Sequence, residues 1–562
     1  MKLAKYLSII ALLTITSAAQ LHAQTLVASV AGSSAIWLEG GQGAFNNLGC
    51  VWTDKNTTSN TYVTDVRSGA GSAQDFGKIW VAWNAAGGTC ASPGVSSTVY
   101  AYISLDSGIG DRCLFARPSC KLTTIDTASN AGSDALGTGF PDTALPSGVL
   151  SAFNNSTINV SGTDILPLDA LFATYQALAP CGALSSGTQF QGYGRGTWPG
   201  PGTQFQAQDG SALFNVLGWQ ITGTDPFTGN AAWGSYAVTP VGATPVVVFV
   251  NTGNASGFGS ASITNADRAT LGLAFSNILV RTSDFIPQVY SSSGGAGMTI
   301  WHRESLSGTY NTFDRAIPNN KELYRPQEQV CPPVEPMNFG RTVGGFTSSN
   351  LRAIGTGDEI SQVFAFTDSI GYAFWSAGNF AKATYGAGTP GTSKYLTVDG
   401  VDPLCSTYGC GGSPGEIPTA TNGLLANVNL SNIANGSYPI WSELRLVSTT
   451  AAGLSAAQTL AGWAQNTVTT PGGSQPDYIT APNLAVIHSH FTLPFVTDGT
   501  TTATVSEGPR VCGPSGPAES GGDAGGVVTS LQAGSDYAVL HSNYNTASCT
   551  GITNAASFGV HQ

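Results

Sequence analysis

The sequence predicts an α/β protein in which mainly parallel strands alternate with helices. Strand-like and helical segments follow one another from residue 25 to residue 465, and such alternation is typical of parallel sheets. Several strand-like segments run directly into a turn of small residues, as at the ligand-binding edge of many α/β proteins. The chain has 562 residues, more than one hydrophobic core usually supports, so two or more domains are expected.

The first strand follows a predicted signal peptide. Residues 1–23 place Lys2 and Lys5 before an apolar run and then small residues, which predicts export with cleavage near Ala19 or Ala23. No cysteine follows either cleavage point, and no later segment holds the roughly 18 uninterrupted apolar residues of a membrane span. We therefore expect a periplasmic or extracellular protein without a lipoprotein anchor or membrane insertion. The mature chain then opens with a strand over 25–30, a turn over 31–35 and a helix over 36–45.

The same pattern continues along the chain. The apolar run 245–251 is the most strand-like segment and should be buried on both faces, and the helix predicted over 263–279 has an Asn-Ala-Asp start. The other predicted elements are strands at 98–103, 157–160, 298–301, 369–375 and 438–447, a helix opening at 355–358 and a helix over 455–465. Segments rich in small and polar residues predict surface insertions near 113–156 and 181–234 and a C-terminal extension over 497–562.

The charge balance limits the partners. Charged residues make up 10% of the chain, and the formal net charge is −12. A nucleic-acid partner would need clustered Lys and Arg, so none is expected. An anionic ligand would have to be bound by local dipoles and a very few cations.

The ten cysteines of an exported chain can pair completely in an oxidising compartment. Sequence neighbours suggest candidate pairs only: Cys50 with Cys90, Cys113 with Cys120, Cys405 with Cys410, and Cys512 with Cys549. The sequence has no Cys-x-x-Cys, and no cysteine cluster accompanies His488 and His490, so neither a metal site nor a cofactor is expected.

The turn from Arg303 to Thr309 packs a cation, hydroxyls and a glycine together after a strand-like segment. A helix starting near Ser307 would point unpaired backbone N–H groups at a ligand over Gly308, while Arg303 offers a planar fork to oxyanion oxygens. The alternative interpretation is a helix cap beside a surface arginine.

Earlier turns carry similar alternatives. Ser33 and Ser34 could simply cap the first helix, and Asp164 could close an Asx-turn or cap a helix. For the turn at Ser107, the glycine-rich turn 68–72 is a competing candidate.

Taken in order, these turns resemble the periplasmic phosphate-binding proteins of phosphate ABC transporters, which are two-lobed periplasmic binding proteins of type 2. In that family an A-G-x-[ST] turn, a S-G-x-G turn, a G-x-S/T-D turn and an R-x-x-x-S-G-T turn converge on one phosphate. The resemblance spans roughly 26–494. It implies that phosphate is bound by Ser33, Ser34, Ala35, Ser107, Asp164, Arg303, Ser307, Gly308 and Thr309.

The resemblance also implies a two-lobed fold with insertions and a C-terminal extension. The first lobe would comprise 24–250 and 365–496, and the second lobe 251–364. Asp164 would accept a hydrogen bond from a protonated oxyanion, which sulfate cannot donate.

The function expected from these features is that of a secreted phosphate-binding protein, the solute-binding component of a phosphate uptake system with a membrane ABC permease as its partner. One alternative is a secreted surface or assembly protein on the same scaffold, suggested by the Gly/Ser/Thr-rich surface and the insertions. A hydrolase is less favoured, because the chain has no G-x-S-x-G elbow and no histidine in a recognisable general-base motif. No catalytic residues are therefore predicted.

Overall fold

The computed structural model describes residues 24–54, 61–67, 73–124, 136–178 without 138, 217–286 without 222, 276 and 277, 295–317 without 305, 340–386, 393–469 and 477–484. It also gives short strands at 180–184, 187–190, 204–206 and 213–215 and between 486 and 540. The predicted signal peptide, most of the 181–234 insertion and most of the C-terminal extension lie outside these residues.

One mixed, partly parallel sheet of 13 strands organises the described residues, and the predicted α/β class is confirmed. The strand order is β17-β18-β16-β19-β14-β22-β9-β1-β6-β5-β2, with β20 and β23 pairing to β14. The first half of the sheet contains β1 (Thr25–Ser33), β2 (Gly49–Asp54), β5 (Lys78–Asn84), β6 (Thr98–Leu105), β9 (Val160–Thr163), β22 (Trp441–Ser448) and β23 (Ile479–Thr480). The second half contains β16 (Thr299–His302), β17 (Gly340–Val343), β18 (Phe346–Arg352), β19 (Ser369–Phe374) and β20 (Ser393–Tyr395).

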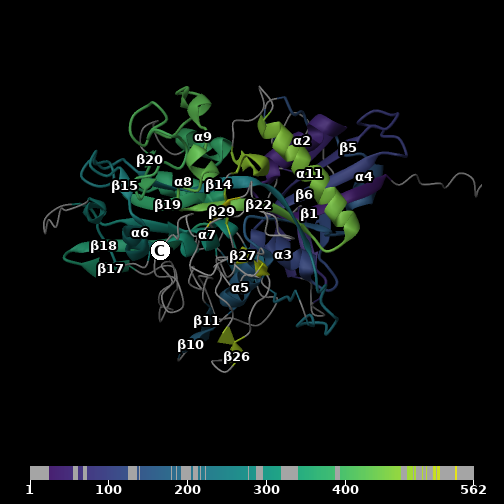
Figure 1. Cartoon of the computed structure of the whole chain (residues 1–562), viewed down its shortest axis with the longest axis horizontal. Coiled ribbons are helices and arrows are strands. Elements are labelled where there is room, and N and C mark those ends of the chain that lie inside the picture. Colours follow the sequence, from purple (N-terminus) through teal and green to yellow (C-terminus); the bar gives the residue numbers. More distant parts are fainter. Residues whose placement is uncertain are drawn as a thin grey trace, which may run out of the picture.

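Strand β14 (Ala237–Asn251) joins the two halves, and Figure 1 shows it with β22 in the middle of the molecule. Up to Pro245 it pairs with β22, and from Val246 onward it pairs with β19 and β20. Its run from Val246 to Val250 is fully buried, which confirms the prediction for 245–251. Two large core clusters therefore meet along a single strand.

The parallel pairs are β1 with β6 and β9, and β16 with β18 and β19. Parallel strands direct their carboxyl ends to the same edge of a sheet, where the turns to the following helices lie close together. The turns that follow β1, β6 and β9 therefore lie at one edge of the first half. Strand β16 runs in the opposite direction in the second half, so the turn that follows it faces them.

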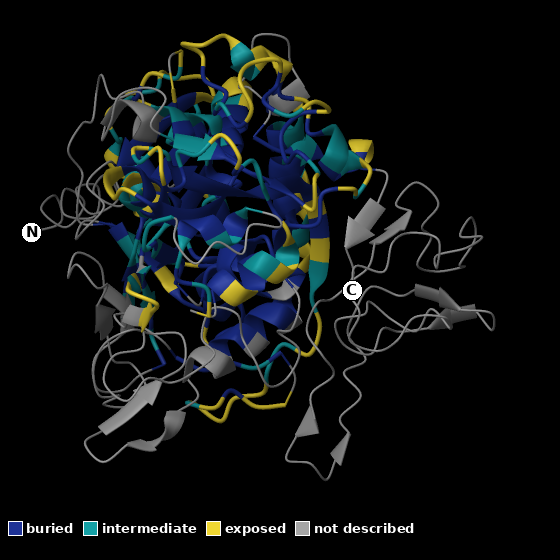
Figure 2. Cartoon of the chain, turned by 90° about the vertical axis from the view of Figure 1, so that its left-hand side faces the viewer, coloured by how far each residue is buried: buried dark blue, intermediate teal, exposed yellow. Residues whose placement is uncertain are grey.

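Helices cover both faces of the sheet (Figure 1), and the sheet between them is almost entirely buried (Figure 2). Over the first half, α2 and α11 lie on one face and α3 and α5 on the other; over the second half, α8 and α9 lie opposite α6 and α7. Their bounds are α2 (Trp37–Leu48), α3 (Ser107–Phe115), α4 (Ser147–Phe153), α5 (Pro167–Leu178), α6 (Arg268–Phe275), α7 (Gly308–Ala316), α8 (Thr356–Ala365), α9 (Ala377–Gly386), α10 (Ser431–Ala434) and α11 (Ala451–Thr469).

Gly43 shows how closely α2 and α11 pack, because a Cβ at this residue would lie 2.5 Å from the carbonyl oxygen of Trp463. The predicted helices over 36–45 and 455–465 are confirmed by these two elements, and the predicted helix over 263–279 is shorter, as α6. The predicted strands at 98–103, 298–301, 369–375 and 438–447 correspond to β6, β16, β19 and β22.

Strands β19 and β20 lie in the range 365–496, which the sequence assigns to the first lobe, but they pair with the part of β14 that belongs to the second half of the sheet. This pairing favours a second lobe that extends past residue 364. The lobe boundaries themselves stay a prediction.

The segment 113–156 differs from the surface insertion expected from its composition. It begins inside α3 and includes β7 (Lys121–Thr124) and α4, and Leu122, Val149 and Phe153 are fully buried. Within 113–124 and 136–156, apolar residues spaced for a strand and a helix therefore contribute to the core. Strand β7 belongs to a separate four-stranded sheet with β3 (Thr61–Asp65), β4 (Ala73–Phe76) and β8 (Ser156–Thr157).

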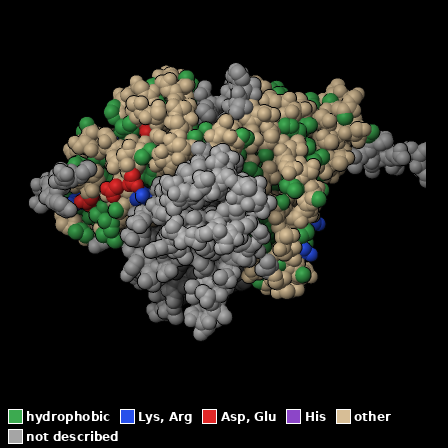
Figure 3. All heavy atoms as spheres, in the orientation of Figure 1, with side chains coloured by type: hydrophobic (Ala, Val, Ile, Leu, Met, Phe, Trp, Pro, Cys, Tyr) green, Lys and Arg blue, Asp and Glu red, His purple; other side chains and the backbone are tan. Residues whose placement is uncertain are grey.

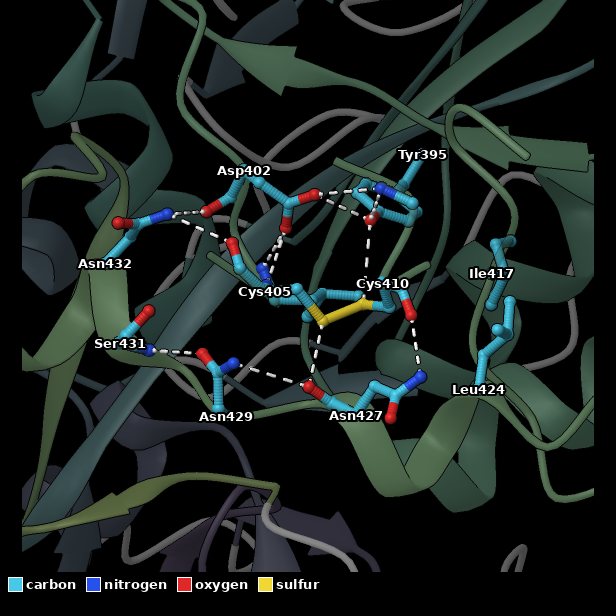
Figure 4. Close-up of a disulfide and its surroundings, with 12 residues drawn as sticks. Tyr395, Asp402, Cys405, Cys410, Ile417, Leu424, Asn427, Asn429, Ser431 and Asn432 are labelled. Atoms are coloured by element: carbon cyan, nitrogen blue, oxygen red, sulfur yellow. Dashed lines mark hydrogen bonds between the residues drawn. A yellow bond between two sulfur atoms is a disulfide. The ribbon is translucent and has the colours of Figure 1, made fainter. Parts of the chain in front are cut away.

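Three of the four suggested disulfides are confirmed: Cys50–Cys90, Cys113–Cys120 and Cys405–Cys410. Cys512 and Cys549 lie outside the residues whose side chains are described. Beside the Cys405–Cys410 bond, the Asp402 carboxylate accepts the backbone N–H groups of Leu404 and Cys405 at 2.6 and 2.7 Å and the Tyr395 hydroxyl at 2.7 Å (Figure 4). These bonds fix the loop that follows β21 (Thr397–Val398).

Charged side chains are sparse on the face of the molecule seen in Figure 3, as the composition indicates. Among the helices of the described residues, none has the length and apolar character of a transmembrane span.

Candidate functional site

Four turns meet where the two halves of the sheet adjoin, a region that we call the junction: those at Ser33, Ser107 and Asp164 in the first half and that from Arg303 to Thr309 in the second. Asp164, which follows β9, lies at the centre. The Ser107 hydroxyl donates a hydrogen bond to its carboxylate, and Ser107 Oγ accepts the Asp164 backbone N–H at 3.3 Å. The Ser33 hydroxyl lies close enough to this carboxylate to lower its pKa. Three turns that are distant in sequence therefore meet at Asp164.

The second half contacts this group through the start of α7. A Cβ placed on Gly308 would lie 2.0 Å from Asp164 Oδ1, so the Gly308 backbone is packed against the carboxylate. The backbone N–H of Gly108, in the first turn of α3, donates to the carbonyl oxygen of Leu306 at 2.9 Å. The two halves of the sheet thus touch directly at Asp164.

Asp164 is 3% exposed. Burial is the largest influence on its pKa and raises it to about 6, against the lowering effects of a backbone hydrogen bond, of Arg303 and Arg445, and of the Ser33 hydroxyl. A carboxyl group with this pKa is mostly ionised at neutral pH and can accept a hydrogen bond from a protonated partner.

Arg303 is buried against an acidic neighbour. Its Nε and Nη2 donate to the two carboxylate oxygens of Glu304 at 2.9 and 2.6 Å, and its Nη1 donates to Thr356 Oγ1 at 3.0 Å. Asp106 Oδ1 lies 3.7 Å from Nη2. Despite burial, which would raise it, the pKa of Glu304 is lowered to about 2, chiefly by Arg303. The edge of the guanidinium is therefore occupied by Glu304.

The structure brings Ser33, Ser107, Asp164 and Gly308 together and assigns local roles to the other predicted residues. Ser307 caps α7, and its hydroxyl accepts the Tyr310 backbone N–H at 3.4 Å. The Ala35 N–H donates to Ser33 Oγ at 3.1 Å. Ser34 is half-buried, Thr309 is buried, and Arg303 pairs with Glu304. Contact of these nine residues with a ligand stays a prediction.

Several acidic and basic residues of the junction were not predicted from the sequence. Asp106 and Glu304 could have been found, because each directly adjoins a predicted site residue. Glu359, Asp111 and Arg445 could not, because helices α8 and α3 and strand β22 bring them in and no motif marks them.

Two of these carboxyl groups retain protons at neutral pH. Burial raises the pKa of Glu359 to about 8, although Arg303 and the Tyr372 backbone N–H, 3.1 Å from Glu359 Oε1, oppose the shift. Burial likewise raises the pKa of Asp111 to about 8, against the lowering effects of the nearby Ser161 and Thr163 hydroxyls. The junction thus contains two arginines, Arg303 and Arg445, and several carboxyl groups, of which Glu359 and Asp111 are protonated for the most part at neutral pH.

This burial predicts that the free energy of unfolding decreases as pH rises. Between about pH 5 and pH 8 the folded chain keeps protons on Glu359 and Asp111, whereas an unfolded chain with carboxyl pKa values near 4 has released them. Each excess proton of the folded state lowers the stability by about 1.4 kcal/mol per pH unit. Glu304 acts in the opposite sense only at more acidic pH, because its folded-state pKa is about 2.

Urea unfolding measured at several pH values in this window tests the prediction. The substitution Glu359→Gln should reduce the pH slope by one proton's contribution. Stability that rises steadily across the window, or a slope that Glu359→Gln leaves unchanged, would contradict it.

Within the described ranges, no three or more His, Cys, Asp or Glu side chains are grouped as a metal ion would require.

No protein-family model matches the chain, and no curated protein matches it by sequence. Comparison with solved structures does find matches, and these include phosphate-binding proteins. PfluDING, a high affinity periplasmic phosphate-binding protein solved with bound phosphate, is 14% identical; the match covers 80% of this chain and 95% of that chain with a TM-score of 0.31. A phosphate binding protein from Stenotrophomonas maltophilia is 16% identical over 67% of this chain and 80% of that chain, with a TM-score of 0.28.

PstS from Borrelia burgdorferi is 14% identical over 42% of this chain and 67% of that chain, with a TM-score of 0.22. Phosphate-binding proteins are thus among the solved structures to which the chain is similar.

Proposed function

We propose that the chain is a secreted binding protein for phosphate, or for a related tetrahedral oxyanion that keeps a proton at neutral pH. The observation that supports this proposal is the position of Asp164, a buried carboxyl group between the hydroxyls of Ser33 and Ser107 and the backbone of Gly308. A protonated oxyanion can donate to Asp164 while its other oxygens accept from hydroxyl and backbone N–H groups.

The helix starts supply the positive potential that the net charge of −12 does not. Helix α3 begins at Ser107 and α7 at Gly308, so both N-termini lie beside Asp164. The N-terminus of a helix favours an anion through its dipole and its unpaired N–H groups. Together with Arg303, these dipoles offset the charge of the ligand and of Asp164.

Opening and closing of the two halves about β14 and β22 would admit and enclose the ligand. In the closed arrangement Gly308 is packed against Asp164, so a ligand enters only when the halves separate. We further propose that residues 1–23 direct export, that the closed, liganded form delivers phosphate to a membrane ABC permease, and that the chain has no catalytic role.

Isothermal titration calorimetry with phosphate and sulfate tests the proposal. Wild-type protein should bind phosphate with micromolar or tighter affinity and discriminate against sulfate, because sulfate would leave its oxygen facing the Asp164 carboxylate without a proton between them. Asp164→Asn can donate to either anion, so the preference for phosphate should fall at least about tenfold, or about 1.4 kcal/mol.

Asp477→Asn is the matched control. Asp477 is also a buried carboxyl group with a pKa raised to about 6, chiefly by burial, but it lies beside Glu39 and the start of α9, where it accepts the Ala377 N–H at 2.8 Å. This variant should keep the wild-type preference. Absence of phosphate binding in the wild type, or an unchanged preference in Asp164→Asn, would refute the proposal.

A further inference from the structure

Asp106 and Glu304 face each other across the junction, and the binding of an oxyanion does not require either. Asp106 immediately precedes α3 in the first half, and Glu304 precedes α7 in the second half. Both residues are buried, and their carboxyl groups converge on one guanidinium nitrogen, because Arg303 Nη2 lies 2.6 Å from Glu304 Oε1 and 3.7 Å from Asp106 Oδ1. Asp106 does not cap α3 with its side chain, although the residue before a helix commonly does. Its side chain is directed to the other half of the sheet instead.

The charges around this contact indicate that one of the two carboxyl groups is protonated, because a single guanidinium faces both of them. Arg303 is the cation beside the pair, and its Nε and Nη2 are bonded to Glu304, whereas Asp106 Oδ1 is 3.7 Å from Nη2. The charged and titratable groups that face Asp106 are Glu304, Arg303 and Asp164, and Glu359 faces Arg303 from α8. One guanidinium compensates one carboxylate, so a second buried carboxylate at this place would be costly.

Of the two carboxyl groups, Asp106 is the better placed to hold a proton. Arg303 donates two hydrogen bonds to Glu304 and favours its ionised form, whereas Asp106 Oδ2 is buried without a hydrogen-bond partner. Burial together with Glu304 also raises the pKa of Asp106 well above its ordinary value. Two carboxylates can hydrogen-bond only when one of them is protonated, because an ionised carboxylate has no donor. A protonated Asp106 could therefore donate its O–H to the Glu304 carboxylate.

We propose that Asp106 is a proton-carrying latch: its carboxylic acid bonds the first half of the molecule to Glu304 in the second half, so that closure of the junction takes up one proton. When the halves separate, Asp106 is left in water at the positive end of α3 and ionises like an ordinary aspartate. Closure and proton uptake are then linked, and a rise in pH favours the open form.

This latch would regulate the site proposed above, and its effect on phosphate affinity rests on that proposed function. One linked proton weakens binding by up to about tenfold per pH unit above the pKa of free Asp106. Asp164 and phosphate itself also titrate. The contribution of the latch is therefore the difference in proton uptake between the wild type and a variant that keeps Asp164 and is titrated with the same phosphate.

The substitution Asp106→Asn provides this difference. An asparagine amide can donate to the Glu304 carboxylate without binding a proton, so the variant should remain able to close. Titration of phosphate in buffers of different ionisation enthalpy counts the protons taken up on binding. Near neutral pH the variant should take up about one proton fewer than the wild type, and its affinity should decline less steeply with pH by up to about tenfold per unit. Asp477→Asn, the control, should match the wild type in both respects.

A second variant and a second measurement keep the test decisive. Glu304→Gln also removes the shared proton, because Asp106 then becomes the carboxylate partner of Arg303. This variant should likewise take up about one proton fewer than the wild type when it binds phosphate. Small-angle scattering of the protein without phosphate should show a radius of gyration that increases with pH in the wild type and not in Asp106→Asn.

Equal proton counts in the wild type, Asp106→Asn and Glu304→Gln, or a radius of gyration with the same pH dependence in the wild type and Asp106→Asn, would overturn the latch. A wild type that fails to bind phosphate but shows the pH-dependent radius would refute the proposed function and leave the latch standing.

Discussion

Replacing Arg303 with methionine should destabilise the folded chain by about 3–5 kcal/mol, the cost of leaving the partner of a buried ion pair without its counter-charge. Arg303 is 2% exposed, and its two hydrogen bonds to Glu304 make it the main cause of the low pKa of that carboxyl group. Methionine fills much of the same volume without a charge. Urea unfolding at neutral pH measures the loss.

The pH dependence of this variant distinguishes a lost ion pair from a packing defect. Without Arg303 the pKa of Glu304 should rise, because burial then acts on it without the opposing cation. A raised carboxyl pKa lowers stability as pH rises above the unfolded value of about 4.3, so Arg303→Met should be least impaired in acid. A packing defect would impair the protein equally at every pH.

The double variant Arg303→Met/Glu304→Gln separates stability from binding. Removing both charges should restore much of the stability, because no uncompensated charge remains. Phosphate binding should stay weak, because the junction still lacks the Arg303 guanidinium. A single variant as stable as the wild type at neutral pH, or a double variant that binds phosphate normally, would contradict this account of Arg303.

The sequence was sufficient to predict the local elements that bring the site together. Small-residue turns expected at 31–35, 104–110 and 161–164 pointed to the carboxyl ends of three strands, although these strands run further than expected, to Ser33, Leu105 and Thr163. Strand β1 pairs in parallel with β6 and β9. The structure accordingly brings Ser33, Ser107 and Asp164 together. The path of β14 could not be predicted from the sequence. Its partner changes from β22 to β19 after Pro245, and both partner strands lie more than 100 residues further along the chain.

The charges of the junction were hidden for a different reason. A carboxyl group next to a predicted ligand residue, such as Asp106 or Glu304, is on average exposed, and only the three-dimensional contact shows that both are buried against Arg303. The same limit applies to Ser307: its cap of α7 is visible in the sequence pattern, but whether the N–H groups beyond it receive a ligand depends on the opposite half. Composition also misled for the described residues of 113–156, where Leu122, Val149 and Phe153 are buried in the core.

Replacing Gly308 with alanine should weaken phosphate binding at least about 100-fold, or about 2.7 kcal/mol. The added Cβ would lie 2.0 Å from Asp164 Oδ1, 2.3 Å from Cγ and 2.7 Å from Oδ2. Asp164 cannot rotate away freely, because the Ser107 hydroxyl donates to its carboxylate and accepts its backbone N–H. Either these bonds break or the two halves stay apart, and both outcomes remove the closed site.

Gly378→Ala is the matched control, because Gly378 also lies in the first turn of a helix, α9, and no heavy atom lies within 4 Å of a Cβ at that position. Alanine is the better helix former by up to about 1 kcal/mol, so this variant should be at least as stable as the wild type and should bind phosphate normally. Scattering should report a larger radius of gyration for Gly308→Ala than for Gly378→Ala if the halves are held apart. If calorimetry finds equal phosphate affinity in the two alanine variants, then contact between α7 and Asp164 is not needed for binding, and the ligand site must lie elsewhere.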